Sequence, residues 1–172
     1  IDADGTMHVT ETDTYEFNGV FNGILIGLDQ SDSDGIENFE VYEVTDEAYI
    51  PLEYEETSEG SRNQYKIYSA SEDETKVFEY SYSVMNAVKV YEDTAELYWK
   101  FFNEKNQNAL GNVQIDVEFP DGAAQEEIKA FGHGPLDGSI ERLEDRIVRF
   151  RVSELPAAKM FEVRLLFPDY YV

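Results

Sequence analysis

Cysteine is absent from this 172-residue chain, which excludes disulfide bonds, thiolate zinc sites and cysteine nucleophiles. Its absence does not decide the compartment, because exported proteins can also lack cysteine. No apolar stretch approaches the ~18 residues that a membrane helix needs, and no signal peptide is recognisable. With two histidines and no G-x-S-x-G motif, the chain offers few residues for nucleophilic catalysis.

Basic residues are missing from the first third of the chain. Residues 1–61 contain 17 acidic side chains and no Lys or Arg, and the formal net charge of the whole chain is -24. Such a surface repels phosphate backbones and acidic lipid headgroups, so nucleic-acid binding is not expected. The charge serves solubility, and a cationic partner or a divalent metal is the alternative.

Aromatic and apolar residues are plentiful, at 14% and 42%, which favours a packed core over disorder. The clearest pattern is VKVYEDTAELYWKFF, residues 88–102, where an acidic turn joins two strands. Ala95, Leu97, Trp99 and Phe101 fall on one face of the second strand. This alternation predicts a half-buried strand with Trp99 in a core.

Similar alternating segments recur along the chain with turn signals between them. They predict an all-β, immunoglobulin-like β-sandwich of about a dozen strands without a long helix or a repeat of fixed period. We treat residues 1–172 as one sandwich region and leave a division into two β subdomains open. The polar stretch 70–76 is the candidate seam, between an acidic part (1–72) and a sandwich (75–172).

The predicted strand 6–17 breaks its own pattern. Glu11 and Asp13 fall on the face that also carries Met7 and Val9. Either a β-bulge shifts the register, or a carboxylate turns inward beside a partner. Glu11 is therefore a candidate functional residue.

The acidic loop 29–35, DQSDSDG, resembles the middle of a calcium loop. Gln30 and Val41 do not fit the first and last ligand positions of an EF-hand, so an acidic turn is the competing interpretation. The candidate metal ligands are Asp29, Asp32 and Asp34.

His133 is the second candidate functional residue. It lies between Gly132 and Gly134, which leave the backbone free and the ring accessible. It either braces a turn or acts as a lone metal ligand or proton shuttle, although the sequence shows no partner for it.

Two groups of side chains complete the candidates. Four tyrosines form either a stacking platform for sugars or peptides or an ordinary sheet covering: Tyr49, Tyr54, Tyr65 and Tyr68. Four arginines are expected to pair with carboxylates of the acid-only segment and to dock the two parts of the chain: Arg142, Arg146, Arg149 and Arg151.

An ordered set of motifs resembles a known family. The motifs are DGTMHVTETDTYEFNGVFNGI (4–24), YSVMNAVKVYEDTAELYWKFFN (82–103), FGHGPLDGSI (131–140) and FEVRLLFP (161–168). They are similar to the extracytoplasmic region of bacterial predicted membrane proteins, the domain-of-unknown-function 2207 family. The family tends to carry an Arg soon after the FNGI-like segment, where this chain has Ile26, so the resemblance supplies no basic partner for Glu11.

The resemblance implies a β-rich domain outside the cell, with a signal peptide before Ile1 and a membrane anchor after Val172, and it brings no catalytic residues. We therefore expect a non-enzymatic extracytoplasmic domain that binds an envelope protein or another cell-surface component, or organises assembly there, without a cofactor. The alternative is a calcium-stabilised sugar- or peptide-binding module, and an acid–base hydrolase ranks below both.

Overall fold

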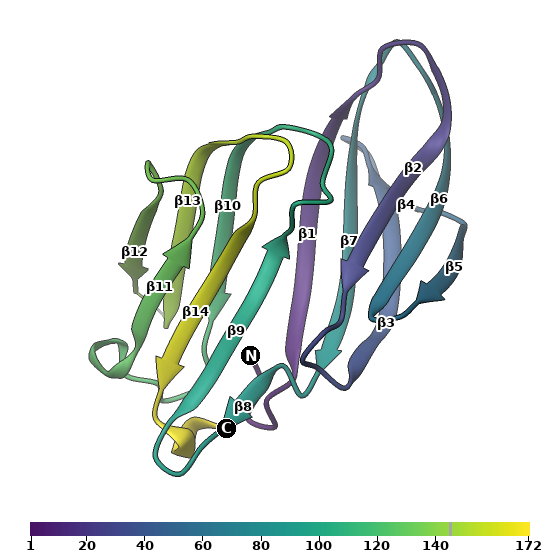
Figure 1. Ribbon diagram of the computed structural model, residues 1–172. Helices are drawn as coiled ribbons and strands as arrows, with labels where there is room; N and C mark the ends of the chain where they lie inside the picture. The colour runs from purple at the N-terminus through teal and green to yellow at the C-terminus, as the bar shows by residue number, and fades with distance from the viewer. Residues whose placement is uncertain (145) are drawn as a thin grey trace. The chain divides into compact units, whose positions relative to one another are not determined.

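The computed structural model describes residues 1–144 and 146–172, which form two compact units. The first unit contains residues 1–7 and 86–172, and the second contains residues 8–85. These described residues form 14 strands and two single-turn 3₁₀ helices (Figure 1). The prediction of an all-β, sandwich-like fold is confirmed. Within the same residues, no helix is long and apolar enough to cross a membrane.

The second unit has a four-stranded and a three-stranded sheet. The first sheet has the order β1 (Met7–Glu16), β7 (Thr75–Met85), β3 (Gly35–Val44) and β4 (Tyr49–Pro51). The second has the order β2 (Val20–Asp29), β6 (Arg62–Glu72) and β5 (Tyr54–Glu59). Alternate side chains of the central strands, such as Ile67 and Phe78, are fully buried. Residues 70–76 join β6 to β7 inside this unit, so the division of the chain falls after Met85 instead.

The first unit also has a four-stranded and a three-stranded sheet. One has the order β11 (Lys129–His133), β14 (Phe161–Phe167), β9 (Ala95–Phe102) and β8 (Val88–Val90). The other has the order β10 (Leu110–Glu118), β13 (Ile147–Leu155) and β12 (Ser139–Leu143). The 3₁₀ turns η1 (Gln125–Glu127) and η2 (Asp169–Tyr171) lie in connections. The 88–102 hairpin forms as predicted, and Trp99 is only 6% exposed.

The two units repeat one topology, although the sequence shows no fixed period. Strands β9, β10, β11, β12, β13 and β14 correspond in chain order to β1, β2, β3, β5, β6 and β7. In one sheet of each unit the corresponding strands lie in the same order, β9-β14-β11 in the first unit and β1-β7-β3 in the second. In the other sheet the order is β10-β13-β12 in the first unit and β2-β6-β5 in the second. The remaining strands, β8 and β4, are edge additions. A sandwich constrains which positions are apolar but not which residues fill them, so such a repeat leaves little trace in the sequence.

Candidate functional site

The site is built on the outer face of strands β9, β14 and β11 in the first unit. Cross-strand neighbours point to the same side of a sheet, so the strand register defines this face. One row is His133–Glu162–Lys100 and the next is Phe131–Arg164–Tyr98. We call these six side chains, together with Glu96 and Lys129 of the following row, the Tyr98 face.

Glu162 is the most deeply covered charged group of the Tyr98 face. Its side chain is only 7% exposed, because Tyr98, His133 and Lys100 surround it. The Tyr98 hydroxyl donates a hydrogen bond to Glu162 Oε1 at 2.6 Å, and His133 Nδ1 lies 3.1 Å from the same oxygen. The Lys100 ammonium lies 3.8 Å from Oε2.

These contacts decide the protonation of Glu162. Burial alone raises the pKa of the carboxyl, but the hydrogen bonds from Tyr98 and His133 and the charge of Lys100 lower it below its usual value. The same hydrogen bond raises the pKa of the Tyr98 hydroxyl. Glu162 is therefore a fixed anion held by its neighbours.

A second carboxylate of the Tyr98 face is held in a similar way. Arg164 Nε lies 2.5 Å from Glu96 Oε1, and the Tyr91 hydroxyl donates a hydrogen bond to Glu96 Oε2 at 3.2 Å. The Glu96 side chain is 15% exposed, whereas Arg164 is 46% exposed. Solvent at this face therefore meets the cation more than the anion that it neutralises.

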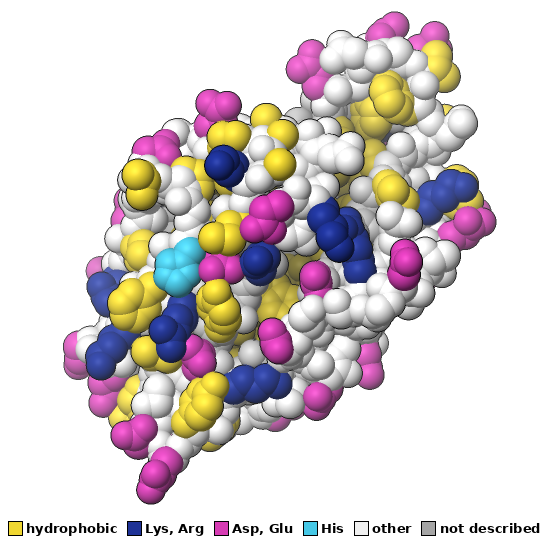
Figure 2. Space-filling model, viewed as in Figure 1, with side chains coloured by type: hydrophobic (Ala, Val, Ile, Leu, Met, Phe, Trp, Pro, Cys, Tyr) yellow, Lys and Arg dark blue, Asp and Glu magenta, His cyan; other side chains and the backbone are white. Residues whose placement is uncertain are grey.

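The exposed part of the Tyr98 face is basic and aromatic. Tyr98 and Phe131 are 50% and 44% exposed on either side of Arg164, and Lys100 and Lys129 are exposed as well. Figure 2 shows basic and hydrophobic side chains over β9, β14 and β11, with acidic side chains between them. The arrangement can stack flat apolar surfaces and donate hydrogen bonds to anions.

The structure gives His133 the partner that its sequence context does not show. That partner, Glu162, follows the buried Phe161 in strand β14, so the alternation places it away from the core and indicates solvent. Sequence reasoning therefore missed Glu162 and Tyr98. The only signal was that Tyr98, Glu162 and His133 each lie on the polar side of an alternating or glycine-flanked strand.

Glu11 lies in the second unit, and its side chain turns inward, which is the second of the two interpretations of the predicted strand 6–17. The burial alternation of β1 continues through Glu11, Asp13 and Tyr15. The Tyr80 hydroxyl donates a hydrogen bond to Asp13 Oδ2 at 2.9 Å. Burial and the neighbouring Asp13 charge raise the pKa of Glu11, and burial raises the pKa of Asp13. Two acids thus share a tyrosine-lined interior.

The candidate calcium ligands form an acidic turn. The Asp29 carboxylate accepts hydrogen bonds from the backbone N–H and the hydroxyl of Ser31, and Asp32 has a positive φ of 65°. Across residues 1–144 and 146–172, no group of three or more His, Asp or Glu side chains is arranged to hold a metal ion. The structure thus does not bring Asp29, Asp32 and Asp34 together as such a group.

The tyrosine platform and the arginine docking surface do not form as expected. Tyr65 is 1% exposed and stacks on Phe39 at 3.8 Å inside the core, while Tyr49, Tyr54 and Tyr68 are exposed. The docking hypothesis is wrong, because the arginines bind partners of their own unit. Arg149 forms a two-pronged pair with Asp116 across β10 and β13. Arg151 contacts Glu141 and Gln114, Arg146 contacts Glu118 and Asp121, and Arg142 contacts the Ile128 carbonyl.

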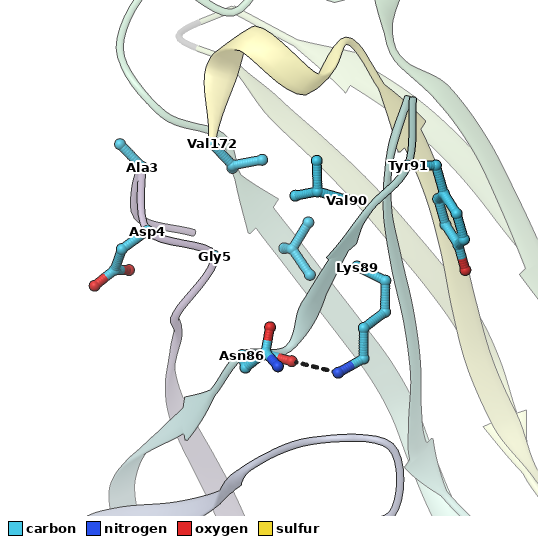
Figure 3. A pocket seen from close by; sticks show the side chains of 9 residues that line it. Ala3, Asp4, Gly5, Asn86, Lys89, Val90, Tyr91 and Val172 are labelled. Carbon is cyan, nitrogen blue, oxygen red and sulfur yellow. Dashed lines mark hydrogen bonds between the residues drawn. The ribbon is translucent and has the colours of Figure 1, made fainter. Parts of the chain in front are cut away.

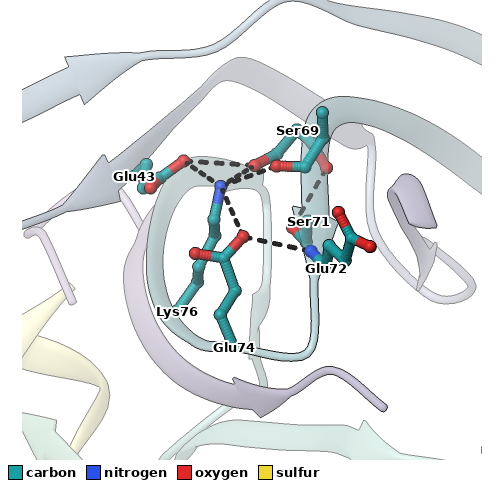
Figure 4. Close-up of polar contacts among 7 residues, drawn as sticks. Glu43, Ser69, Ser71, Glu72, Glu74 and Lys76 are labelled. Atoms are coloured by element: carbon teal, nitrogen blue, oxygen red, sulfur yellow. Dashed lines mark hydrogen bonds and ion pairs between the residues drawn. The ribbon is translucent and has the colours of Figure 1, made fainter. Parts of the chain in front are cut away.

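In the second unit, Lys76 is surrounded by polar groups of neighbouring segments and serves the fold (Figure 4). Lys76 Nζ lies 3.2 Å from Glu43 Oε2, 3.1 Å from Ser69 Oγ and 2.9 Å from the Ala70 carbonyl oxygen. A further carboxylate, Glu74, lies at 3.8 Å. The cluster ties β3 to the β6–β7 turn and satisfies the lysine, which is 13% exposed.

An open cleft of about 530 Å³ lies in the first unit (Figure 3). It is lined by residues 3–5, Asn86, residues 88–91 and Val172. Lys89 Nζ already donates a hydrogen bond to the Asn86 carbonyl oxygen at 3.1 Å. Tyr91 links the cleft to the Tyr98 face, because its hydroxyl binds Glu96.

Comparison with known proteins gives one match. Residues 1–167 match the model of the family described as predicted membrane protein (DUF2207) N-terminal domain. Neither the curated proteins nor the solved structures contain a match to the chain.

Proposed function

Because the chain belongs to the family of predicted membrane protein (DUF2207) N-terminal domains, we propose that it is a non-enzymatic extracytoplasmic module that binds another component of the cell envelope. The observation that carries this proposal is the position of the Tyr98 face. A group of exposed aromatic and basic side chains lies there on an open sheet, where a large partner can reach it. Enzymes generally surround their reacting groups in a concave pocket.

The extracytoplasmic side can be tested with a single cysteine, since the chain has none of its own. Leu136 is fully exposed, so Leu136→Cys in the full-length protein should react with a membrane-impermeant maleimide in intact cells. Leu97→Cys is the matched control, because Leu97 is fully buried and its thiol should react only after unfolding. Labelling of Leu136→Cys only after the membrane is permeabilised would contradict the proposal.

The binding role is tested separately with purified protein. The chain should co-sediment with isolated envelope material, and Lys100→Glu together with Arg164→Glu should abolish this. Lys66→Glu in the second unit is the control, because Lys66 is also an exposed strand lysine, with its side chain 58% exposed. Equal retention of all three proteins, or no retention of the parent, would contradict a role for the Tyr98 face.

A further inference from the structure

We propose that the Tyr98 face binds an acidic glycan, a saccharide chain that carries carboxylate groups. This inference rests on the binding role proposed above and names the ligand class for it. Its basis is the combination, on one open sheet, of exposed aromatic rings and exposed cations whose carboxylate neighbours are covered.

The charge of the face differs from that of the chain. The chain as a whole carries -24, yet Lys100, Lys129 and Arg164 present positive charge here. The two carboxylates of the face, Glu96 and Glu162, are held under these cations and under tyrosine hydroxyls. An arriving ligand therefore meets ammonium and guanidinium groups, which bind carboxylates by charge-assisted hydrogen bonds.

The aromatic rings add a flat apolar surface to these donors. Phe131 and Tyr98 occupy β11 and β9, on either side of Arg164 in β14. Strands are spaced by about 4.8 Å, so the backbones that carry the two rings lie roughly 10 Å apart. One extended chain can therefore cover both rings and the guanidinium between them.

A saccharide fits this face better than an acidic peptide does. A strand adds to a sheet at its edge, and the backbone groups of β14 and β9 are paired with neighbouring strands on both sides, so a peptide that lies across this face cannot hydrogen-bond to them as another strand. The face is a row of side chains rather than an apolar groove, so it does not suit an amphipathic helix either. Sugar rings need only the aromatic faces and the side-chain donors.

The repeated topology shows that the sandwich does not require these side chains. The corresponding face of the second unit lies on β1, β7 and β3. Thr12 there binds Glu79, and Ser81 stands opposite Glu40. Hydroxyls and carboxylates thus occupy positions where the Tyr98 face has cations, and Tyr42 supplies a ring opposite Glu79, so the exposed cations beside the rings are the specialisation of one unit.

The test is calorimetric titration with an oligogalacturonate, using an uncharged galactose oligomer and polyglutamate for comparison. At about 0.01 M salt the Debye length is roughly 30 Å, so the whole net charge repels the ligand. At about 0.15 M it is roughly 8 Å and the face dominates, whereas at about 1 M the face is screened too. We expect oligogalacturonate affinity to be highest at the intermediate salt concentration and to exceed that of both comparison ligands.

Variants assign the binding to the Tyr98 face. Lys100→Ala with Arg164→Ala should weaken oligogalacturonate binding about tenfold or more, which corresponds to ~1.4 kcal/mol. Phe131→Ala should also weaken it, and this ring makes no hydrogen bond whose loss could disturb the fold. Lys66→Ala is the matched control, because Lys66 lies 4.9 Å from the Tyr68 ring on the other unit and should change nothing.

Three outcomes would overturn the inference: no oligogalacturonate binding at any salt concentration, equal binding of the uncharged oligomer, or polyglutamate binding that is at least as tight and insensitive to Phe131→Ala. The last result would identify an acidic peptide as the ligand. None of these outcomes changes the cysteine-labelling result, so failure of the ligand class is distinguishable from failure of the proposed location.

Discussion

The two units share one topology and differ in where they place charge. Residues 8–85 carry 19 acidic and three basic side chains, whereas the first unit carries 18 acidic and ten basic ones. Strand β1 turns Glu11 and Asp13 inward, while the corresponding strand β9 turns Leu97 and Trp99 inward. A sandwich therefore tolerates acids at a core position when a tyrosine hydroxyl is available and the acids can keep a proton.

The difference predicts opposite responses of the two units to pH. In the first unit the neighbours of Glu162 stabilise its ionised form. In the second unit burial stabilises the protonated forms of Glu11 and Asp13. Lowering the pH should thus destabilise the first unit relative to a variant that lacks the Glu162 carboxyl. It should stabilise the second unit relative to variants that lack the carboxyls of Glu11 or Asp13.

The largest effects are expected from truncating each core. Leu97 and Ile67 are fully buried in the first and second units, so Leu97→Ala and Ile67→Ala should each cost about 2–5 kcal/mol. Trp99 is the only tryptophan, so its fluorescence reports unfolding of the first unit. Urea unfolding should show Leu97→Ala shifting the fluorescence midpoint, and Ile67→Ala shifting mainly the circular-dichroism change of the second unit. A shift of the fluorescence midpoint by Ile67→Ala as large as that by Leu97→Ala would show that the units do not unfold separately.

The second prediction concerns the inward acid of β1. A carboxyl with a raised folded-state pKa binds more protons when folded, so stability is full below pH 4.5 and is lost as the pH rises toward about 8. Glu11→Gln removes this loss. At pH 8 the variant should be more stable than the parent by roughly 1–2 kcal/mol, a value reduced because Glu11 is only partly buried. At pH 4 the two should be equal, as measured by urea unfolding followed by circular dichroism.

Glu16→Gln provides the control for Glu11→Gln, because Glu16 lies on the exposed side of the same strand. It should leave the pH dependence of unfolding unchanged. A constant stability difference between Glu11→Gln and the parent from pH 4 to pH 8 would contradict inward ionisation as the cause.

The third prediction concerns Glu162 and has the opposite sign. A lowered folded-state pKa contributes stability above the unfolded value near 4.5, and this contribution is lost as the pH falls further. Glu162→Gln should therefore cost about 1 kcal/mol at pH 7 and progressively less below pH 4. Trp99 fluorescence during urea unfolding measures it, with the exposed Glu154→Gln as the control. A cost that stays the same at pH 3 would contradict the role of the Glu162 charge.

The sequence predicts the hairpin of residues 88–102 and the buried Trp99, because two-residue alternation and turn chemistry are local properties. Alternation could not predict the burial of Glu162, which depends on side chains 64 and 29 residues away. The alternation predicts that the Glu162 side chain points away from the core. It does not predict which side chains cover Glu162 on the outer face of the sheet.

The same locality explains the errors at the domain level. Residues 70–76 are polar because they contain the tight turn by which the chain passes from β6 in one sheet to β7 in the other, and polar composition does not distinguish a turn from a linker. Arg149 was expected to reach the acidic part of the chain, but Asp116 is its cross-strand partner on β10. A carboxylate at the directly opposed position of a neighbouring strand lies close to the arginine, so the two pair with each other rather than with groups elsewhere in the chain.

The smallest effect on stability is expected from adding calcium. This experiment tests whether the acidic side chains of the second unit bind a specific ion. The backbone N–H and the hydroxyl of Ser31 already donate hydrogen bonds to Asp29 Oδ1, and within the described residues the acidic loop does not gather three carboxylates around one point. Millimolar calcium should therefore move the thermal midpoint of the second unit no more than magnesium at the same ionic strength, since both only screen its charge. A larger shift with calcium that chelator reverses, and that Asp32→Asn with Asp34→Asn abolishes, would establish a calcium site that distinguishes this unit from its partner in the repeat.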